Sequence, residues 1–429
     1  MTQIYRVLST WLCLILLSCG AANAYDYPFT DPYVATVLGT PAEFAAVLPE
    51  DVPIKNDSIV MFPERKVPGV LWNFADLNYS YIKVDGPAPL IFLIAGTGAS
   101  FESEKMISMQ RAFYGAGFNV ISLSSPTFTD FVVSASSSQV PGNLEEDSAD
   151  LYRVMQAVWA IHQDEMDVTE FYLTGYSLGA AQSVFLSQID DTEKAFNFSK
   201  VLLINPPLSL YNSVVKLDKM LEDNIPGGMD HFAEFYQKVI HRFGKVYKNG
   251  DAVQLNDQFL YKAYLYDKPK TDEPTAAMVG LSFRLSSVNM VFVSDVMTQA
   301  GYVVPKGLVL ERNEIIIDYG KVLSQLTFID YFNGIFMPHF KAQDPTITET
   351  EVISRMSLRN KEKYLRNTTK IGLIHNQDDI IMLPGEVDYL KGVFGDRATI
   401  YPHGGHCGNM SYPDNVTAMV GFFKGITQK

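Results

Sequence analysis

The chain has few cysteines, few charged residues and no long hydrophobic run. Only 3 of its 429 residues are cysteine, and 19% are charged, whereas 47% are hydrophobic. So few cysteines cannot supply a disulfide framework, and a hydrophobic core must hold the fold together. The composition also argues against a disordered chain, and the length allows one large domain with an insertion or two domains.

The charged residues that are present are mainly acidic, with 48 Asp and Glu against 34 Lys and Arg. The formal net charge of −14 argues against nucleic acid as a partner, because nucleic-acid binding depends on basic side chains that contact phosphates. It also provides no attraction towards anionic membranes.

The first 24 residues have the composition of an export signal. They contain one basic residue, Arg6, and no acid, followed by an apolar run at residues 11–17 and small residues at 22–24. This run is well short of the roughly 20 residues that a membrane-spanning helix needs. Cleavage after Ala24 would give an exported protein, periplasmic or secreted, without an integral membrane span. Lipoprotein anchoring at Cys19 is an alternative, because residues 16–19 resemble a lipobox.

Removal of this segment changes the cysteine count and the charge. Cys13 and Cys19 would leave with it, so Cys407 would remain alone and no intramolecular disulfide could form. The net charge of −14 would become −15, because Arg6 is also lost.

From Ser58 onward, apolar runs of strand length alternate with stretches of helical periodicity. Such alternation is typical of a largely parallel sheet with helices on both faces. Helices are expected at residues 102–115 and 147–165. The pattern predicts an antiparallel pair followed by six further strands, at residues 59–62, 79–84, 90–95, 119–123, 171–174, 201–205, 371–375 and 398–401.

The regular alternation stops after Pro207 and resumes near Lys370. About 160 residues intervene, far more than a connection between neighbouring strands requires. We therefore expect an inserted, mainly helical domain, with amphipathic helices at 232–243 and 318–331. The predicted division is a signal peptide at 1–24, a first core part at 25–210, the insertion at 211–365 and a second core part at 366–429.

A predicted strand runs through a Gly-x-Ser-x-Gly turn into a predicted helix. The turn consists of Gly175, Ser177 and Gly179 with one residue between each. A serine on so sharp a turn adopts strained backbone angles, and the two glycines let neighbouring backbone approach without a clash. Its hydroxyl would lie above the sheet at the positive end of a helix, as a nucleophile requires.

Two loops further along the chain carry groups that could activate a serine, which needs a base and a group that orients the base. Asp378 and Asp379 follow the strand at 371–375, and His403 and His406 follow the last strand. Serine, acid and histidine thus each come at the carboxyl end of a strand, where open α/β sheets place their sites.

These motifs resemble those of the α/β-hydrolases over about residues 58–210 and 365–429, which leaves the insertion outside. The resemblance implies an α/β-hydrolase fold, with a mostly parallel sheet, helices on both faces and the insertion as a cap. It places the nucleophile at Ser177 and selects Asp379 as the acid and His406 as the base. Asn376 stands where the family usually has glycine.

An oxyanion hole must also supply backbone N–H groups where negative charge develops. One donor is expected at Leu178, the residue after the nucleophile. By resemblance to the family's turn after the strand at 90–95, the other is expected at Thr97 in the segment Gly96-Thr97-Gly98. Read alone, these glycines could suggest a phosphate loop, but that pattern is incomplete.

The remaining polar residues of these loops have simpler interpretations. Asp378 is interpreted as a solvated loop acid or a helix cap, and Cys407 as a packed small side chain. His403 is interpreted as a surface residue, with a hydrogen-bond donor that supports the catalytic residues as the alternative. The spacing of His403, His406 and Cys407 does not match a familiar zinc site, so no metal and no cofactor is expected.

The resemblance implies an exported serine hydrolase that cleaves a carboxylic ester, or a related acyl bond, of a small-molecule substrate. A peptidase, thioesterase or acyltransferase remains an alternative, because the acyl-enzyme step is shared. A catalytically silent envelope binding protein is another. The apolar insertion could favour an apolar substrate, although its aromatic stripes would also supply its own core. The sequence leaves the oligomeric state open.

Overall fold

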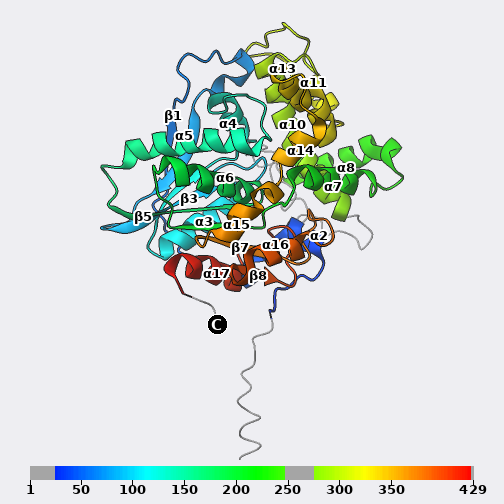
Figure 1. Ribbon diagram of the computed structural model, residues 1–429. Helices are drawn as coiled ribbons and strands as arrows, with labels where there is room; N and C mark the ends of the chain where they lie inside the picture. The colour runs from blue at the N-terminus through cyan, green and yellow to red at the C-terminus, as the bar shows by residue number, and fades with distance from the viewer. Residues whose placement is uncertain (1–24, 247–274, 427–429) are drawn as a thin grey trace, which may run out of the picture.

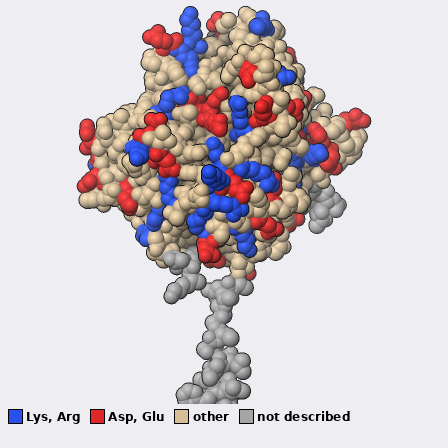
Figure 2. Space-filling model, viewed as in Figure 1, with Lys and Arg blue, Asp and Glu red and all other residues tan. Residues whose placement is uncertain are grey.

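The structure is a computed structural model that describes residues 25–246 and 275–426 (Figure 1). The predicted export signal at 1–24, with Cys13 and Cys19, lies outside these residues. A central sheet is flanked by helices, and a helical layer built from the insertion lies at one end of the sheet (Figure 1). On the face shown in Figure 2, acidic and basic side chains are interspersed.

Eight strands of the described residues form one sheet, in the order β1-β2-β4-β3-β5-β6-β7-β8. β2 runs antiparallel to both of its neighbours, and the pairs from β4 to β8 are parallel. The strands are β1 (Lys55–Ile59), β2 (Leu77–Ile82), β3 (Ala88–Ile94), β4 (Asn119–Leu123), β5 (Val168–Tyr176), β6 (Lys200–Ile204), β7 (Ile371–Asn376) and β8 (Ala398–Tyr401).

All eight predicted strands are present, but the first two are displaced and β5 begins three residues before and ends two residues after the predicted 171–174. β1 lies almost entirely before the predicted 59–62, and β2 ends before the predicted residue 84. β1 is a polar edge strand whose first four residues are exposed, so no apolar run marks it in the sequence. Most of the apolar residues on which the prediction of 59–62 was based lie after the end of β1 at Ile59.

Alternate residues of β3 enter the two layers that flank the sheet. Leu90 and Phe92 join a cluster with α5 (Leu144–His162) and α6 (Leu178–Glu193), whereas Ile91 and Leu93 join a cluster with α3 (Glu104–Gly115) and α17 (Pro413–Lys424). These layers explain why the strands read as continuous apolar runs. The core helices are α2 (Pro32–Leu38), α3 (Glu104–Gly115), α4 (Thr129–Ser134), α5 (Leu144–His162), α6 (Leu178–Glu193), α16 (Glu386–Phe394) and α17 (Pro413–Lys424).

The insertion between β6 and β7 is helical and contains no strand within its described residues. Its α-helices are α7 (Leu210–Glu222), α8 (Phe232–Val246), α10 (Thr275–Thr298), α11 (Ile317–Leu323), α12 (Phe328–Tyr331), α13 (Met337–Gln343), α14 (Glu349–Arg355) and α15 (Glu362–Asn367). Short 3₁₀ or π segments complete the chain, at Ala42–Phe44, Gly69–Phe74, Met229–His231, Phe332–Phe336, Leu358–Lys361 and Gly395–Arg397. The strand order and the mainly helical insertion confirm the predicted α/β-hydrolase fold.

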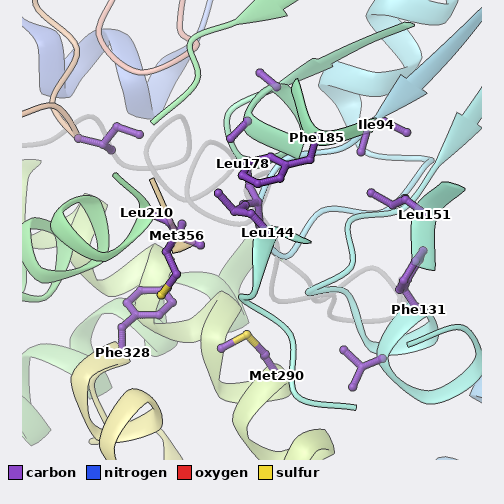
Figure 3. Close-up of a cluster of buried hydrophobic side chains, with 14 of the residues drawn as sticks. Ile94, Phe131, Leu144, Leu151, Leu178, Phe185, Leu210, Met290, Phe328 and Met356 are labelled. Atoms are coloured by element: carbon purple, nitrogen blue, oxygen red, sulfur yellow. The ribbon is translucent and has the colours of Figure 1, made fainter. Parts of the chain in front are cut away.

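The cap shares a hydrophobic core with one face of the sheet. Ile94 of β3 and Leu151 of α5 belong to the same buried cluster as Met290 and Phe328 of the insertion (Figure 3). Burying apolar surface against the sheet stabilises the cap in one place over the ends of the strands.

The two predicted cap helices have different outcomes. α8 is present, with Phe232 and Val239 buried on its expected face; the side chains of Ile240 and Phe243 lie outside the described residues. The single helix predicted at 318–331 is wrong, because α11 and α12 are separate. A capping box of Thr327 and Asp330 begins α12 and thereby interrupts the helical repeat.

The longest cap helix, α10, was not predicted. Among the described helices, only α10 is long and apolar enough to cross a membrane, but 78% of its most apolar window is buried within the protein. It packs against α7, where a Cβ at Gly280 would lie 2.5 Å from the backbone nitrogen of Leu221. We interpret α10 as the core helix of the cap.

The buried carboxyl group of Asp130 should make stability depend on pH. Asp130 is 2% exposed, its Oδ1 has no hydrogen-bond partner, and burial raises its pKa to about 7 despite hydrogen bonds from Asn78. The folded state therefore keeps a proton that the unfolded chain releases near pH 4, so stability falls as the pH rises from about 4 to 7. We expect Asp130→Asn to raise the free energy of unfolding at pH 8 by on the order of 1–3 kcal/mol, and with it the melting temperature. At pH 4 the substitution should have little effect. Thermal unfolding at the two pH values tests this, and equal shifts at both would contradict it.

Candidate active site

Ser177 lies on a strained turn between β5 and α6. Its φ is +53° and its ψ is −123°, a combination that side-chain-bearing residues rarely adopt. A Cβ at Gly175 would lie 2.5 Å from the carbonyl carbon of Gly179, and one at Gly179 would lie 2.3 Å from the oxygen of Ile94. Both the strained serine and the need for two glycines, predicted from the sequence, are confirmed.

The three side chains predicted as a triad are connected by hydrogen bonds. His406 Nε2 lies 2.9 Å from Ser177 Oγ, and His406 Nδ1 lies 3.0 and 3.1 Å from the two oxygens of Asp379. All three are buried, and they come from the turn after β5, the loop after β7 and the loop after β8. The sheet thus brings together residues that are separated by up to 229 positions.

Other polar groups hold the Asp379 carboxylate in place. It accepts hydrogen bonds from Asn205 Nδ2 at 2.9 Å and from the backbone N–H of Ile381 at 3.1 Å. Burial disfavours its charged form, but His406, His375 and Asn205 together hold the pKa of Asp379 below its ordinary value. Asn205 directly follows β6 and has a φ of +48°, and no motif in the sequence marks it as part of the site.

The same ion pair acts on the histidine. Burial is the largest single influence and favours the neutral imidazole, but the charges and hydrogen bonds of Asp379 and Cys407 together outweigh it and raise the pKa of His406 above its ordinary value. An imidazole in this environment accepts a proton readily and is stabilised once it carries one. This is the electrostatic arrangement that a general base for Ser177 needs.

The adjacent acid, Asp378, has a different role from the one expected. Its two carboxylate oxygens accept hydrogen bonds from the backbone N–H groups of Gly404 and Gly405, at 3.2 and 2.9 Å. It is half-buried and caps no helix, so the interpretation as a solvated or capping acid is wrong. Asp378 instead fixes the loop that carries His406.

Asn376, which replaces the usual glycine, holds the same loop. Its Nδ2 donates to the carbonyl oxygen of Gly405 at 2.8 Å, and its side chain pairs with that of Asn409 through two hydrogen bonds of 2.7 and 2.9 Å. All of these groups are buried. The departure from the family pattern therefore adds a contact between the acid loop and the histidine loop.

The segment at residues 25–40 also contacts the histidine loop. Thr36 Oγ1 accepts a hydrogen bond from the backbone N–H of His406 at 2.9 Å and donates one to the oxygen of Pro32 at 2.6 Å. A Cβ at Gly405 would lie 2.3 Å from that same Pro32 oxygen. α2 thus packs directly against the backbone beside the histidine, although nothing in the sequence pattern indicates this.

His403 is not the surface residue that the sequence suggested. It is half-buried, and its ring lies 5.0 Å from the ring of Tyr25 and 6.1 Å from that of Tyr27. The residues that follow the predicted cleavage site bury it. Cys407 is buried, as expected for a packed small side chain, with its Sγ 3.9 Å from His406 Nε2.

We expect Thr36→Val to lower kcat by about tenfold, because it removes the acceptor that holds the His406 backbone while keeping the shape of the side chain. Thr36→Ser should retain activity. Thr298→Val is a matched control, since Thr298 is also half-buried and bonds the carbonyl oxygen four residues earlier, in α10. Steady-state kinetics over a pH series test the prediction, and equal losses in the Thr36 and Thr298 variants would contradict it.

The two residues predicted for the oxyanion hole lie beside the nucleophile. Leu178 is the first residue of α6, so its N–H has no acceptor within the helix and lies at the positive helix end. Thr97 lines the same cavity as Ser177 and His406. The N–H of the next residue, Gly98, is already bonded to Thr127 Oγ1 at 2.7 Å. The donor role of Leu178 and Thr97 stays a prediction.

The cap closes the site from above. Phe283 of α10 lies with its ring 6.3 Å from that of His406, and Ser282 and Ser286 of the same helix line the cavity beside Ser177. A Cβ at Gly98 would lie 3.0 Å from Cβ of Ser286, so α10 packs onto the turn after β3. Among the described residues, no three acids, histidines or cysteines are grouped as a metal site would require.

No protein-family model matches the chain, and no curated protein matches its sequence. Solved structures share part of its chain trace. A hydrolase candidate from Legionella pneumophila is 12% identical, with a TM-score of 0.45, over 93% of this chain and 95% of that one. A Pyrococcus furiosus esterase is 10% identical, with a TM-score of 0.42, over 88% and 97%. A membrane phospholipase A is 12% identical, with a TM-score of 0.43, over 87% and 86%. The α/β-hydrolase fold of this chain follows from its own strand order and turn, and no subfamily is assigned.

Proposed function

We propose that the protein is a serine hydrolase that cleaves a carboxylic ester, or a related acyl bond, of a small molecule. The observation that carries this proposal is the hydrogen-bonded series from Ser177 through His406 to Asp379, on a strained turn that exposes the serine to a cavity. A serine with only a structural role would need neither a strained backbone nor a buried histidine that is itself hydrogen-bonded to a buried carboxylate.

In the proposed reaction, Ser177 Oγ attacks the carbonyl carbon while His406 Nε2 takes its proton. Asp379 stabilises the imidazolium, and the N–H groups of Thr97 and Leu178 stabilise the oxyanion. His406 then protonates the leaving alcohol. Water attacks the acyl-enzyme with His406 again as the base, and the acid is released.

Two other classes of function use the same scaffold. A peptidase, thioesterase or acyltransferase would share the acyl-enzyme step, whereas a silent binding protein would not turn over at all. Turnover of p-nitrophenyl acetate by the purified protein separates hydrolysis from binding alone. A folded protein that releases no more p-nitrophenol than buffer does would contradict the hydrolase.

Export of the protein is a proposal from the sequence, with cleavage after Ala24 and with lipidation of Cys19 as the alternative. Tyr25, the residue directly after the proposed cleavage site, lies 4.7 Å, ring to ring, from Tyr401 and so belongs to the folded protein. The mass of the mature protein from its native host distinguishes cleavage, lipidation and retention of the segment.

A further inference from the structure

Two cavities of unequal size meet at the nucleophile. Both are lined by Ser177, His406, Thr97 and Phe283, so an ester carbonyl bound at Ser177 would direct its two halves into different spaces. One cavity has a free volume of about 160 Å³ and the other, called the crevice here, about 20 Å³. The two halves of a substrate therefore face different limits on size.

The crevice is narrow and apolar. Apart from the four residues that line both cavities, the crevice has one polar lining residue, Ser213. Its hydroxyl donates to the carbonyl oxygen of Ile381 at 3.0 Å, so it has no proton left to donate to a ligand. A volume of about 20 Å³ has room for one group the size of a water molecule or a methyl. The remaining lining residues are Pro207, Leu210, Val214, Leu217, Phe328 and Ile381.

The larger cavity is lined by oxygen atoms that can accept hydrogen bonds. The hydroxyl of Thr40 donates to the oxygen of Gly408, and that of Ser286 donates to the oxygen of Ser282, which leaves their lone pairs as acceptors. Glu104 adds a carboxylate, which accepts only, at the same cavity. Lys105 also lines this cavity, so hydroxyl, carboxylate and ammonium groups surround it. A ligand with several hydroxyls, which both donate and accept hydrogen bonds, matches such a polar lining.

The position of the histidine decides which half of the ester enters which cavity. His406 must deliver a proton to the leaving oxygen, so the alcohol lies along the histidine loop. The loop residues Cys407, Gly408 and Met410 line the larger cavity and not the crevice. The alcohol therefore occupies the larger cavity, and the acyl group occupies the crevice.

We propose that the substrate is an acetyl ester of a polyhydroxylated alcohol, such as a sugar or glycerol. The proposal rests on the proposed function. Ser177 Oγ bonds to the acetyl carbon, the bond from that carbon to the polyol oxygen breaks, and the serine proton passes through His406 Nε2 to the polyol. Water then cleaves the acetyl-serine bond and yields acetate, one proton and the free serine.

Acyl size is tested with p-nitrophenyl acetate, butyrate and octanoate, which share one leaving group. We expect kcat/KM to fall by at least about tenfold from acetate to butyrate and further to octanoate, because the crevice cannot take the added methylenes. Leu217→Ala should enlarge the crevice and raise the ratio of butyrate to acetate. Leu221→Ala, one turn further along α7, removes a buried leucine outside the crevice and should leave that ratio unchanged.

The alcohol is tested with glycerol monoacetate, which keeps two free hydroxyls, against ethyl acetate. We expect the monoacetate to be cleaved at least about tenfold more efficiently than the alkyl ester, because its free hydroxyls meet the polar groups of the larger cavity. Glu104→Gln and Ser286→Ala should each reduce that preference for the polyol ester.

Equal or better cleavage of octanoate, or no preference for the polyol, would overturn this substrate assignment. The proposed function would still stand if a fluorophosphonate modified Ser177. Failure of the fluorophosphonate reaction in a folded protein would instead count against the hydrolase itself. The two failures are thus distinguishable.

Discussion

Ser177→Ala should abolish ester hydrolysis, with a loss of about 10⁴- to 10⁶-fold in kcat, because no other group can form the acyl-enzyme. The fold should be retained, since alanine differs only by the missing oxygen and the strain of the turn is a property of the backbone. Hydrolysis of p-nitrophenyl acetate and thermal unfolding measure the two effects.

Ser183→Ala is a suitable control for that experiment. Ser183 is a buried serine of α6, and its hydroxyl donates to the oxygen of Gly179 at 2.8 Å without touching the histidine. Activity close to wild type is expected for this variant. A Ser177→Ala protein that hydrolysed esters as fast as the Ser183→Ala protein would show that Ser177 is not the nucleophile.

Asp379→Asn should lower kcat by roughly 10⁴-fold, because the amide cannot hold His406 in the right tautomer or stabilise its charged form. In the wild type, activity should rise with pH as His406 loses its proton. Asp379 raises the pKa of His406, and burial alone would lower it. Removing the negative charge should therefore move the rising limb of the pH profile to lower pH.

The neighbouring Asp378 allows a direct comparison. Asp378→Asn keeps an oxygen acceptor for the N–H groups of the histidine loop, so we expect a loss below about 100-fold and little movement of the pH profile. Measuring kcat/KM from pH 5 to 9 for both variants tests the assignment. A larger loss or a larger pH shift from Asp378→Asn would reverse the roles of the two acids.

The sequence was sufficient for the parts of the fold that have a local signal. β4 and β8 lie at the residues predicted, because buried parallel strands are unbroken apolar runs between polar segments. The Gly-x-Ser-x-Gly turn could also be predicted, because a side chain at either glycine would clash with neighbouring backbone. α10 was not, because it is apolar on all sides and lacks the periodicity of an amphipathic helix.

The supporting contacts of the site could not be predicted from spacing. Thr36 and His406 are 370 residues apart, and Asn376 and Asn409 come from different loops. Such pairs depend on how the strands assemble, which one sequence does not reveal. Asp378 and His403, whose predicted roles were wrong, both belong to these contacts around the histidine loop. The sequence suggested that solvent surrounds them, but they contact residues from other parts of the chain.

The central claim is that Ser177 is an activated nucleophile, and covalent labelling tests it most directly. The purified mature protein and its Ser177→Ala variant are treated with a fluorophosphonate, and their intact masses are measured. We predict a single adduct on the wild type and none on the variant. A folded wild-type protein without an adduct, or an adduct that persists in the variant, would contradict the proposed catalytic site.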